Sequence, residues 1–178
     1  FDRMFHAAAG QIDIFRIADD IGMQDRLLIG PAVFDKFVCP RLKRLVEMAH
    51  SHNVKVMFHS CGSILPVIEK IIELGVDILD PLQTTAVDMN AENIKNNFGR
   101  RIALHGSIDT QYLLPTASAQ QVRENVAHMI DIFADKGGFI LAPTHVLQPD
   151  VPTENIVAMY ETAFQYGSEF YTCKDAAF

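Results

Sequence analysis

Two side chains with clear chemical potential, His59 and Cys61, stand two residues apart in the sequence. They close the segment KVMFHSC at 55–61, whose apolar start is typical of a buried strand. Residues i and i+2 of a strand point to the same face, so the imidazole and the thiol could reach one ion. This pair of ligand types suits zinc. The alternative is a structural pair, in which the histidine bonds a neighbouring carboxylate and the cysteine is merely a small buried residue.

A zinc site needs more than two ligands. A catalytic zinc takes three protein ligands and keeps one position open. We expect the third ligand to come from another strand end, and His145 is the best-placed candidate. Asp20 and His105 are the alternatives.

Polar side chains also concentrate where the other apolar segments end. Ligands of parallel sheets bind beyond the carboxyl ends of the strands, so we expect these residues to share one rim. Asp19 and Asp20 could instead cap a loop, and His105 could be a satisfied core histidine. The candidate catalytic residues are Asp19, Asp20 and His145, and the candidate substrate-binding residues are Gln24, Gln83, His105, Asp109, Gln111 and Gln148.

Short apolar segments alternate with amphipathic ones along the whole chain. This order predicts parallel strands joined by crossover helices, either as an open doubly wound sheet or as part of a (β/α)8 barrel. The first strand is not followed by a G-x-G-x-x-G loop, which weakens the nucleotide-binding open sheet. The strands are predicted at 12–18, 55–60, 76–81, 101–106 and 139–143, and the helices at 34–52, 64–74, 91–98, 118–136 and from 152 to about 166.

Five such units are too few for a closed barrel of about 250 residues. We therefore expect about three of the eight units to precede Phe1, which is not the Met of a complete gene product. The predicted fold is α/β, with parallel units that form the C-terminal part of a TIM barrel. The expected domain spans residues 1–167, and residues 168–178 form a C-terminal tail.

The composition excludes several classes of protein. Of the 178 residues, 49% are hydrophobic and 21% charged, which is typical of a globular core and not of a disordered chain. The net charge of -7 means that the chain as a whole lacks the excess of basic residues typical of nucleic-acid-binding proteins. No apolar segment approaches the roughly 18 residues of a membrane span. The 3 cysteines argue against a disulfide framework and for a reducing compartment, so we predict a cytoplasmic protein.

Five segments resemble the uroporphyrinogen decarboxylase superfamily at matching spacing, and together they span nearly the whole chain. The resemblance implies a (β/α)8 barrel whose first strands lie outside this sequence. The segments are ADDIGMQ (18–24), VMFHSCGSI (56–64), GVDILDPLQ (75–83), LHGSIDTQ (104–111) and ILAPTHVLQPDVPTENI (140–156).

The superfamily has two branches, and the sequence carries features of both. One branch contains uroporphyrinogen decarboxylases, which use no metal. The other contains corrinoid-dependent methyltransferases, which bind zinc through a His-x-Cys on one strand and a Cys on the last. His59 and Cys61 match the first pair, whereas Thr144 and His145 stand in place of the last-strand Gly-Cys. His145 instead resembles a histidine of the decarboxylase-type members.

The resemblance implies zinc-dependent methyl transfer as the first expectation. Zinc held by His59, Cys61 and His145 would act as a Lewis acid on a thiol or an ether oxygen of a small-molecule substrate. The methyl carrier would be a corrinoid borne by a partner protein. The residues expected to orient the substrate or the ligand imidazoles are Asp19, Asp20, Gln83, Asp109 and Gln148.

Two alternatives stay open. In the first, the protein is a carboxy-lyase that decarboxylates uroporphyrinogen without metal, and His145 bonds a carboxylate of this tetrapyrrole substrate. In the second, the chain is inactive alone and serves only as a folding or interaction half-barrel. It would then pair with a missing N-terminal half-barrel or form a homodimer, because a half-barrel exposes its sheet edges and an apolar inner face.

Overall fold

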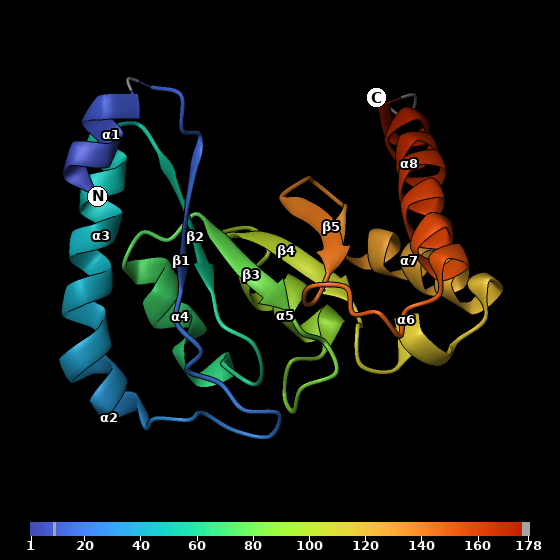
Figure 1. Ribbon diagram of the computed structural model, residues 1–178, viewed down its shortest axis with the longest axis horizontal. Helices are drawn as coiled ribbons and strands as arrows, with labels where there is room; N and C mark the ends of the chain where they lie inside the picture. Colours follow the sequence, from blue (N-terminus) through green and yellow to red (C-terminus); the bar gives the residue numbers. More distant parts are fainter. Residues whose placement is uncertain (9, 176–178) are drawn as a thin grey trace.

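The protein is described from a computed structural model, which covers the backbone of residues 1–8 and 10–175 and their side chains up to Thr172 (Figure 1). Five strands alternate with helices along this part of the chain. The strands are β1 (Ile14–Ala18), β2 (Lys55–His59), β3 (Ile78–Leu82), β4 (Ala103–Ile108) and β5 (Phe139–Pro143). The helices are α1 (Asp2–Ala8), α2 (Pro31–Val33), the π-helix η1 (Phe34–Val38), α3 (Cys39–Ser51), α4 (Leu65–Glu73), α5 (Ala91–Phe98), α6 (Leu113–Thr116), α7 (Ala119–Phe133) and α8 (Thr153–Asp175).

The strands form one parallel sheet in the order β1-β2-β3-β4-β5, which is also their order in the chain. In a doubly wound sheet the strand order reverses at a switch point. The described sheet has no such reversal, so its winding is that of a barrel. The structure confirms the predicted fold, a partial parallel α/β barrel of five units.

The two faces of the sheet have different surroundings. Successive strand side chains point to opposite faces, and one set joins the main core under the helices, including Phe15, Phe58 and Leu104. The other set belongs to the inner face of the partial barrel. Ile14 on β1 and Ile140 on β5 are 44% and 41% exposed. The inner face is therefore open beside both outer strands of the described sheet.

Local sequence signals fix the ends of several helices. Ser118 caps α7, where its hydroxyl accepts from the backbone N–H of Gln121 and the Gln121 side chain accepts from the Ser118 N–H. This capping box confirms the predicted helix start. Gly75, which follows α4, has a φ of 89°, a left-handed conformation that favours glycine after a helix.

The last helix is longer than the sequence predicts. The prediction ends it near Tyr166, whereas α8 continues to Asp175 and crosses the expected boundary between domain and tail. The segment after Tyr166 shows no apolar period because most of its described side chains lie toward solvent. The hydroxyls of Ser168 and Thr172 donate to carbonyls one turn earlier, as polar helix residues do. Residues 176–178 of the expected tail lie outside the described part of the chain.

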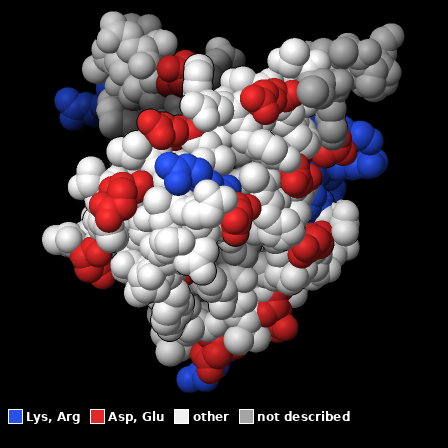
Figure 2. Space-filling model, turned by 90° about the vertical axis from the view of Figure 1, so that its right-hand side faces the viewer, with Lys and Arg blue, Asp and Glu red and all other residues white. Residues whose placement is uncertain are grey.

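The surface beside α7 and α8 has no continuous basic patch among its described residues. Figure 2 shows this side with separate acidic side chains spread among uncharged ones and a few scattered basic ones. Within the described residues, no helix has the length and apolar character needed to cross a membrane.

The packing of the sheet against its helices predicts how much stability is lost when a buried side chain is shortened. Leu104 on β4 is 1% exposed and belongs to the main core. We expect Leu104→Ala to lower the free energy of unfolding by about 2–5 kcal/mol, because the lost burial and the new cavity both destabilise. Urea unfolding of the purified chain measures this change.

Leu28→Ala is the matched control, because Leu28 is 59% exposed. Its expected effect is within about 0.5 kcal/mol. Equal losses of stability in the two variants would contradict the described core.

Candidate functional site

Four neighbouring strands place one polar side chain each on the inner face of the sheet. They are Arg16 on β1, His59 on β2, Asp80 on β3 and His105 on β4. The register pairs His59 with Ala18 on one side and with Asp80 on the other, so these residues lie at similar heights. The sheet thus assembles a polar cluster near the carboxyl ends of its strands.

Asp80 is the centre of this cluster. Its Oδ1 accepts a hydrogen bond from His105 Nδ1 at 2.7 Å, and its Oδ2 lies 2.8 Å from both His59 Nδ1 and Arg16 Nε. Burial alone would raise the pKa of Asp80, but the hydrogen bonds from His105, His59 and Arg16 outweigh it and hold the pKa well below its usual range. Asp80 is therefore an ionised carboxylate that orients both imidazoles.

His59 is fixed at one nitrogen and presents the other. Its hydrogen bond to Asp80, followed by the contact with Cys61, raises the pKa of His59 to about 9. Because an ionised Asp80 can only accept, His59 Nδ1 carries the proton and donates it to Asp80. Arg16 Nη2 lies 2.6 Å from the same nitrogen, but it is itself a donor and could bond Nδ1 only if that nitrogen had lost its proton. The other nitrogen, Nε2, lies 3.6 Å from Cys61 Sγ and 3.7 Å from Asp20 Oδ1.

Asp20, His59 and Cys61 form the cluster that could hold a metal here. Their ligand atoms all lie within 4.8 Å of one another. His145, the favoured third ligand in the sequence prediction, is not in this group, and Asp20, one of the two alternatives, takes its place. His105, the other alternative, directs Nδ1 to Asp80.

Two glycines allow the loops that carry Asp20 and Cys61 to lie against each other. The Cys61 N–H donates to Asp20 Oδ1 at 3.0 Å. A Cβ on Gly22 would collide with the Cys61 carbonyl oxygen. Gly62 has a φ of 87°, and a Cβ there would collide with the Met23 carbonyl. The close approach of these loops thus depends on residues without side chains.

Two adjoining cavities open around this cluster. The first, of about 540 Å³, includes Arg16, Asp19, His59, His105 and His145 in its wall. The second is about 440 Å³, and Asp20 and His145 belong to both walls. These volumes suit a small-molecule ligand. The second wall also contains Gln24, Cys61, Gln83, Gln111 and Gln148.

Three of the predicted glutamines form a connected group. Gln83 is buried, and its Oε1 accepts from the Gly62 N–H at 2.8 Å. Its Nε2 donates to Gln24 Oε1 at 2.8 Å and to Gln111 Oε1 at 3.4 Å. Gln83 therefore ties the Cys61 loop to two further loops of the cavity.

Asp109, unlike the other predicted substrate-binding residues, does not line either cavity. Its side chain accepts from the backbone N–H groups of Gln111, Tyr112 and Leu113, at 3.1, 2.7 and 2.9 Å. The residue is 7% exposed. This position favours a structural role in the turn before α6.

The sequence prediction omits two residues that organise the site. Asp80 stands at a strand end in the sequence, but only the register shows that it contacts two histidines. Arg16 lies inside β1, and its signal is a charged residue within the apolar segment IDIFRIA. The alternation of that segment places Arg16 on the inner face, opposite to Phe15.

A larger hollow, of about 1030 Å³, lies at the other end of the strands. Its wall contains Asp77 before β3 and Gly138 before β5. The Lys95 ammonium in this wall donates to the carbonyls of Phe133 and Asp135 at 2.7 and 2.8 Å. Because parallel sheets bind ligands at their carboxyl ends, we assign the functional site to the smaller cavities.

Comparisons with known proteins agree with this architecture. The family described as Uroporphyrinogen decarboxylase (URO-D) matches residues 8–166. A uroporphyrinogen decarboxylase of Geobacter metallireducens is 25% identical over 138 residues, which cover 75% of this chain and 37% of that protein. The Methylcobamide:CoM methyltransferase MtbA of Methanosarcina acetivorans is 22% identical over 166 residues, which cover 91% of this chain and 46% of that protein.

A solved structure gives the same result. A methyltransferase from Methanosarcina mazei superposes with a TM-score of 0.67 and 25% sequence identity. The match covers 89% of this chain and 42% of that protein. The chain thus spans less than half the length of these relatives.

The contact between His59 and Asp80 predicts a pH dependence in the metal-free protein. Folding raises the pKa of His59 from 6.5 to about 9, so the folded state holds this proton more tightly than the unfolded state. The resulting stabilisation is full below about pH 6.5 and is lost as the pH rises through about 9. NMR titration of the His59 ring measures its pKa, and urea unfolding at about pH 6.5 and above about pH 9 measures the change in stability.

Asp80→Asn is the matched variant, since it keeps the shape of the side chain and removes its charge. We expect the His59 pKa to fall toward 6.5 and the stabilisation to disappear. A His59 pKa near 6.5 in the unsubstituted protein would contradict the assigned contact.

Proposed function

Because the chain belongs to the uroporphyrinogen decarboxylase family, we propose that it is the zinc-binding part of a methyltransferase with a thiol substrate. The observation that carries this proposal is the cluster of Asp20, His59 and Cys61 at the mouth of the partial barrel. Asp20 replaces His145 as the proposed third ligand, because its carboxylate lies beside the other two groups.

The donor atoms fit zinc in type and spacing. Bonds of about 2.0–2.3 Å at tetrahedral angles separate neighbouring ligand atoms by roughly 3.4–3.6 Å. The observed separations from His59 Nε2 are 3.6 Å to Cys61 Sγ and 3.7 Å to Asp20 Oδ1. A thiol and an imidazole favour zinc over magnesium or calcium, which prefer oxygen. Three protein ligands leave one position for substrate, as in catalytic zinc sites.

The surroundings of His59 support ligation through Nε2. Histidines that bind metals usually donate their other ring N–H to a carboxylate, which fixes the ring and increases its basicity. Asp80 is such a partner at 2.8 Å. When bound, zinc would lower the pKa of a substrate thiol and hold it as the thiolate, which is the nucleophile that accepts a methyl group.

The remaining residues of the cavities would bind and orient the substrate. Gln83 and its two glutamine partners present amide groups beside Cys61. His145 and Gln148 lie on the loop after β5, where they are exposed in the cavity wall and free to approach a substrate from solvent. Asp19 lies in the wall beside His59.

The methyl group would come from a corrinoid carried by a partner protein. The support is the similarity to a methylcobamide:CoM methyltransferase and to a second methyltransferase. The chain spans less than half of either protein, so further barrel units or a second copy would complete the active site. The exposure of Ile14 and Ile140 on the inner face supports such a completion. We place this protein in the cytoplasm, where its cysteines stay reduced.

A second candidate is metal-free decarboxylation of uroporphyrinogen. Arg16, His105 and His145 line the same cavity and could bind the carboxylates of a tetrapyrrole. Several uroporphyrinogen decarboxylases are similar to the chain, including that of Geobacter sulfurreducens at 24% identity over 138 residues. A third candidate is a half-barrel that acts only through association with its missing part.

Zinc analysis tests the metal site. We expect the purified chain to lose one equivalent of zinc in Cys61→Ser and in Asp20→Asn, because each change removes a ligand. Asp25→Asn and Cys39→Ala are the controls, since both residues lie outside the cluster. Zinc content that is equal in all of these proteins, or absent from all, would exclude the proposed site.

Anaerobic assays separate the two chemistries. With the complete barrel, we expect methyl transfer from methylcobalamin to a thiol, and at least about a tenfold loss of this rate after zinc is removed with a chelator. We expect no loss of carboxylate from uroporphyrinogen. If chelated protein decarboxylates uroporphyrinogen and transfers no methyl group, the metal-free alternative is correct.

A further inference from the structure

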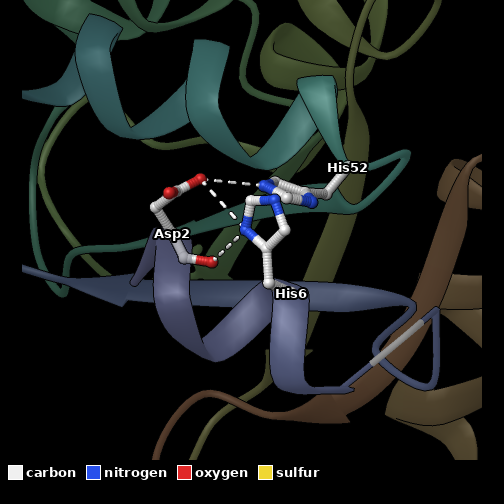
Figure 3. A group of neighbouring side chains, drawn as sticks. All are labelled: Asp2, His6 and His52. Carbon is white, nitrogen blue, oxygen red and sulfur yellow. Dashed lines mark hydrogen bonds and ion pairs between the residues drawn. The ribbon is translucent and has the colours of Figure 1, made fainter.

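A second group of metal-binding side chains lies at the opposite end of the strands. Asp2 and His6 are one turn apart on α1, which precedes β1. His52 caps the carboxyl end of α3, shortly before β2. Figure 3 shows the three side chains converging between these two helices.

The ligand atoms of this group are spaced as in a metal site. Asp2 Oδ1 lies 3.0 Å from His52 Nε2 and 3.6 Å from His6 Nδ1. All three ligand atoms lie within 4.8 Å of one another. Tetrahedral zinc with nitrogen and oxygen ligands at about 2.0–2.2 Å requires separations of roughly 3.3–3.5 Å. His6 Nδ1 also contacts the Asp2 carbonyl oxygen at 2.9 Å, a bond that a small ring rotation would release.

One ligand of this group, His52, is packed against the core, and the other two are exposed to solvent. The His52 ring lies 5.3 Å from the ring of Phe5, which is 3% exposed and packs edge-on against Phe15 of β1. The His52 side chain is 20% exposed, whereas Asp2 and His6 are 59% and 69% exposed. An ion could therefore enter from solvent, bind a ligand that packing already orients, and keep water in its fourth position.

We propose that Asp2, His6 and His52 form a second zinc site, separate from Asp20, His59 and Cys61, and that its ion fastens α1 to the end of α3. Two imidazoles and one carboxylate favour zinc over magnesium or calcium. The ion would join residues 50 positions apart, Asp2 and His52. Because the site requires the folded chain, zinc binding stabilises that state.

The experiment uses the Cys61→Ala protein, so that the first cluster lacks its thiol. Zinc chloride is titrated into this protein, with bound metal measured by equilibrium dialysis and stability by the Tm. We expect about one equivalent of zinc, a rise in Tm, and slower amide exchange in α1. Adding His6→Ala or Asp2→Asn should weaken the zinc affinity at least about tenfold and remove both effects.

His128→Ala is the matched control, because this histidine is exposed on α7 and lies outside both clusters. It should leave the zinc affinity and the Tm rise unchanged. Magnesium at the same concentration should give no rise. Failure of the Cys61→Ala protein to bind zinc, or binding that His6→Ala and Asp2→Asn leave intact, overturns the proposal. Zinc that binds without slowing exchange in α1 overturns the proposed fastening role.

Discussion

The Asp80 carboxylate is the interaction on which the candidate site depends. It accepts hydrogen bonds from His59, His105 and Arg16, side chains that three different strands bring to the inner face. A buried carboxylate with several charge-assisted bonds is stable as an anion, and removing it would leave cationic groups uncompensated. Through this contact the direction of His59 Nε2 is fixed, so that this nitrogen lies 3.6 Å from Cys61 Sγ and 3.7 Å from Asp20 Oδ1.

The barrel winding explains why these residues can meet. Neighbouring strands are consecutive in the chain and parallel, so their carboxyl ends face one side and every loop there can contribute. Because strand side chains alternate between the two faces, Phe15, Phe58 and Leu104 pack under the helices, while Arg16, His59, Asp80 and His105 lie on the inner face. The loops that carry Asp20 and Cys61 can contact each other because Gly22 and Gly62 have no Cβ to block their close approach.

The sequence predicted the five strands and their parallel winding, because apolar periodicity is a local signal, and it placed the polar strand-end residues at one edge of the sheet. It predicted that the His59 and Cys61 side chains lie together, as they do, and it named His145 as their first-choice partner, whereas the side chain that lies beside them is that of Asp20. Whether Asp20 or His145 lies beside His59 and Cys61 depends on how their loops pack. The position of a residue in the sequence does not determine this packing. The sequence likewise did not indicate that the Asp109 carboxylate accepts hydrogen bonds from the backbone of its own loop. Beyond Tyr166, α8 continues without an apolar period, and the Tyr171 hydroxyl donates to the Ala134 carbonyl just after α7, a tertiary contact that no local pattern indicates.

Family membership and geometry contribute different parts of the account. Membership gives the barrel fold and relatives that include decarboxylases and methyltransferases, while the donor set of Asp20, His59 and Cys61 is the basis of our proposal of a zinc-dependent activity. Diffraction from zinc-soaked crystals at wavelengths on either side of the zinc absorption edge tests this most directly. The account predicts an anomalous peak bonded to Cys61 Sγ, His59 Nε2 and the Asp20 carboxylate. A fully soaked crystal without zinc density at Cys61 would contradict it.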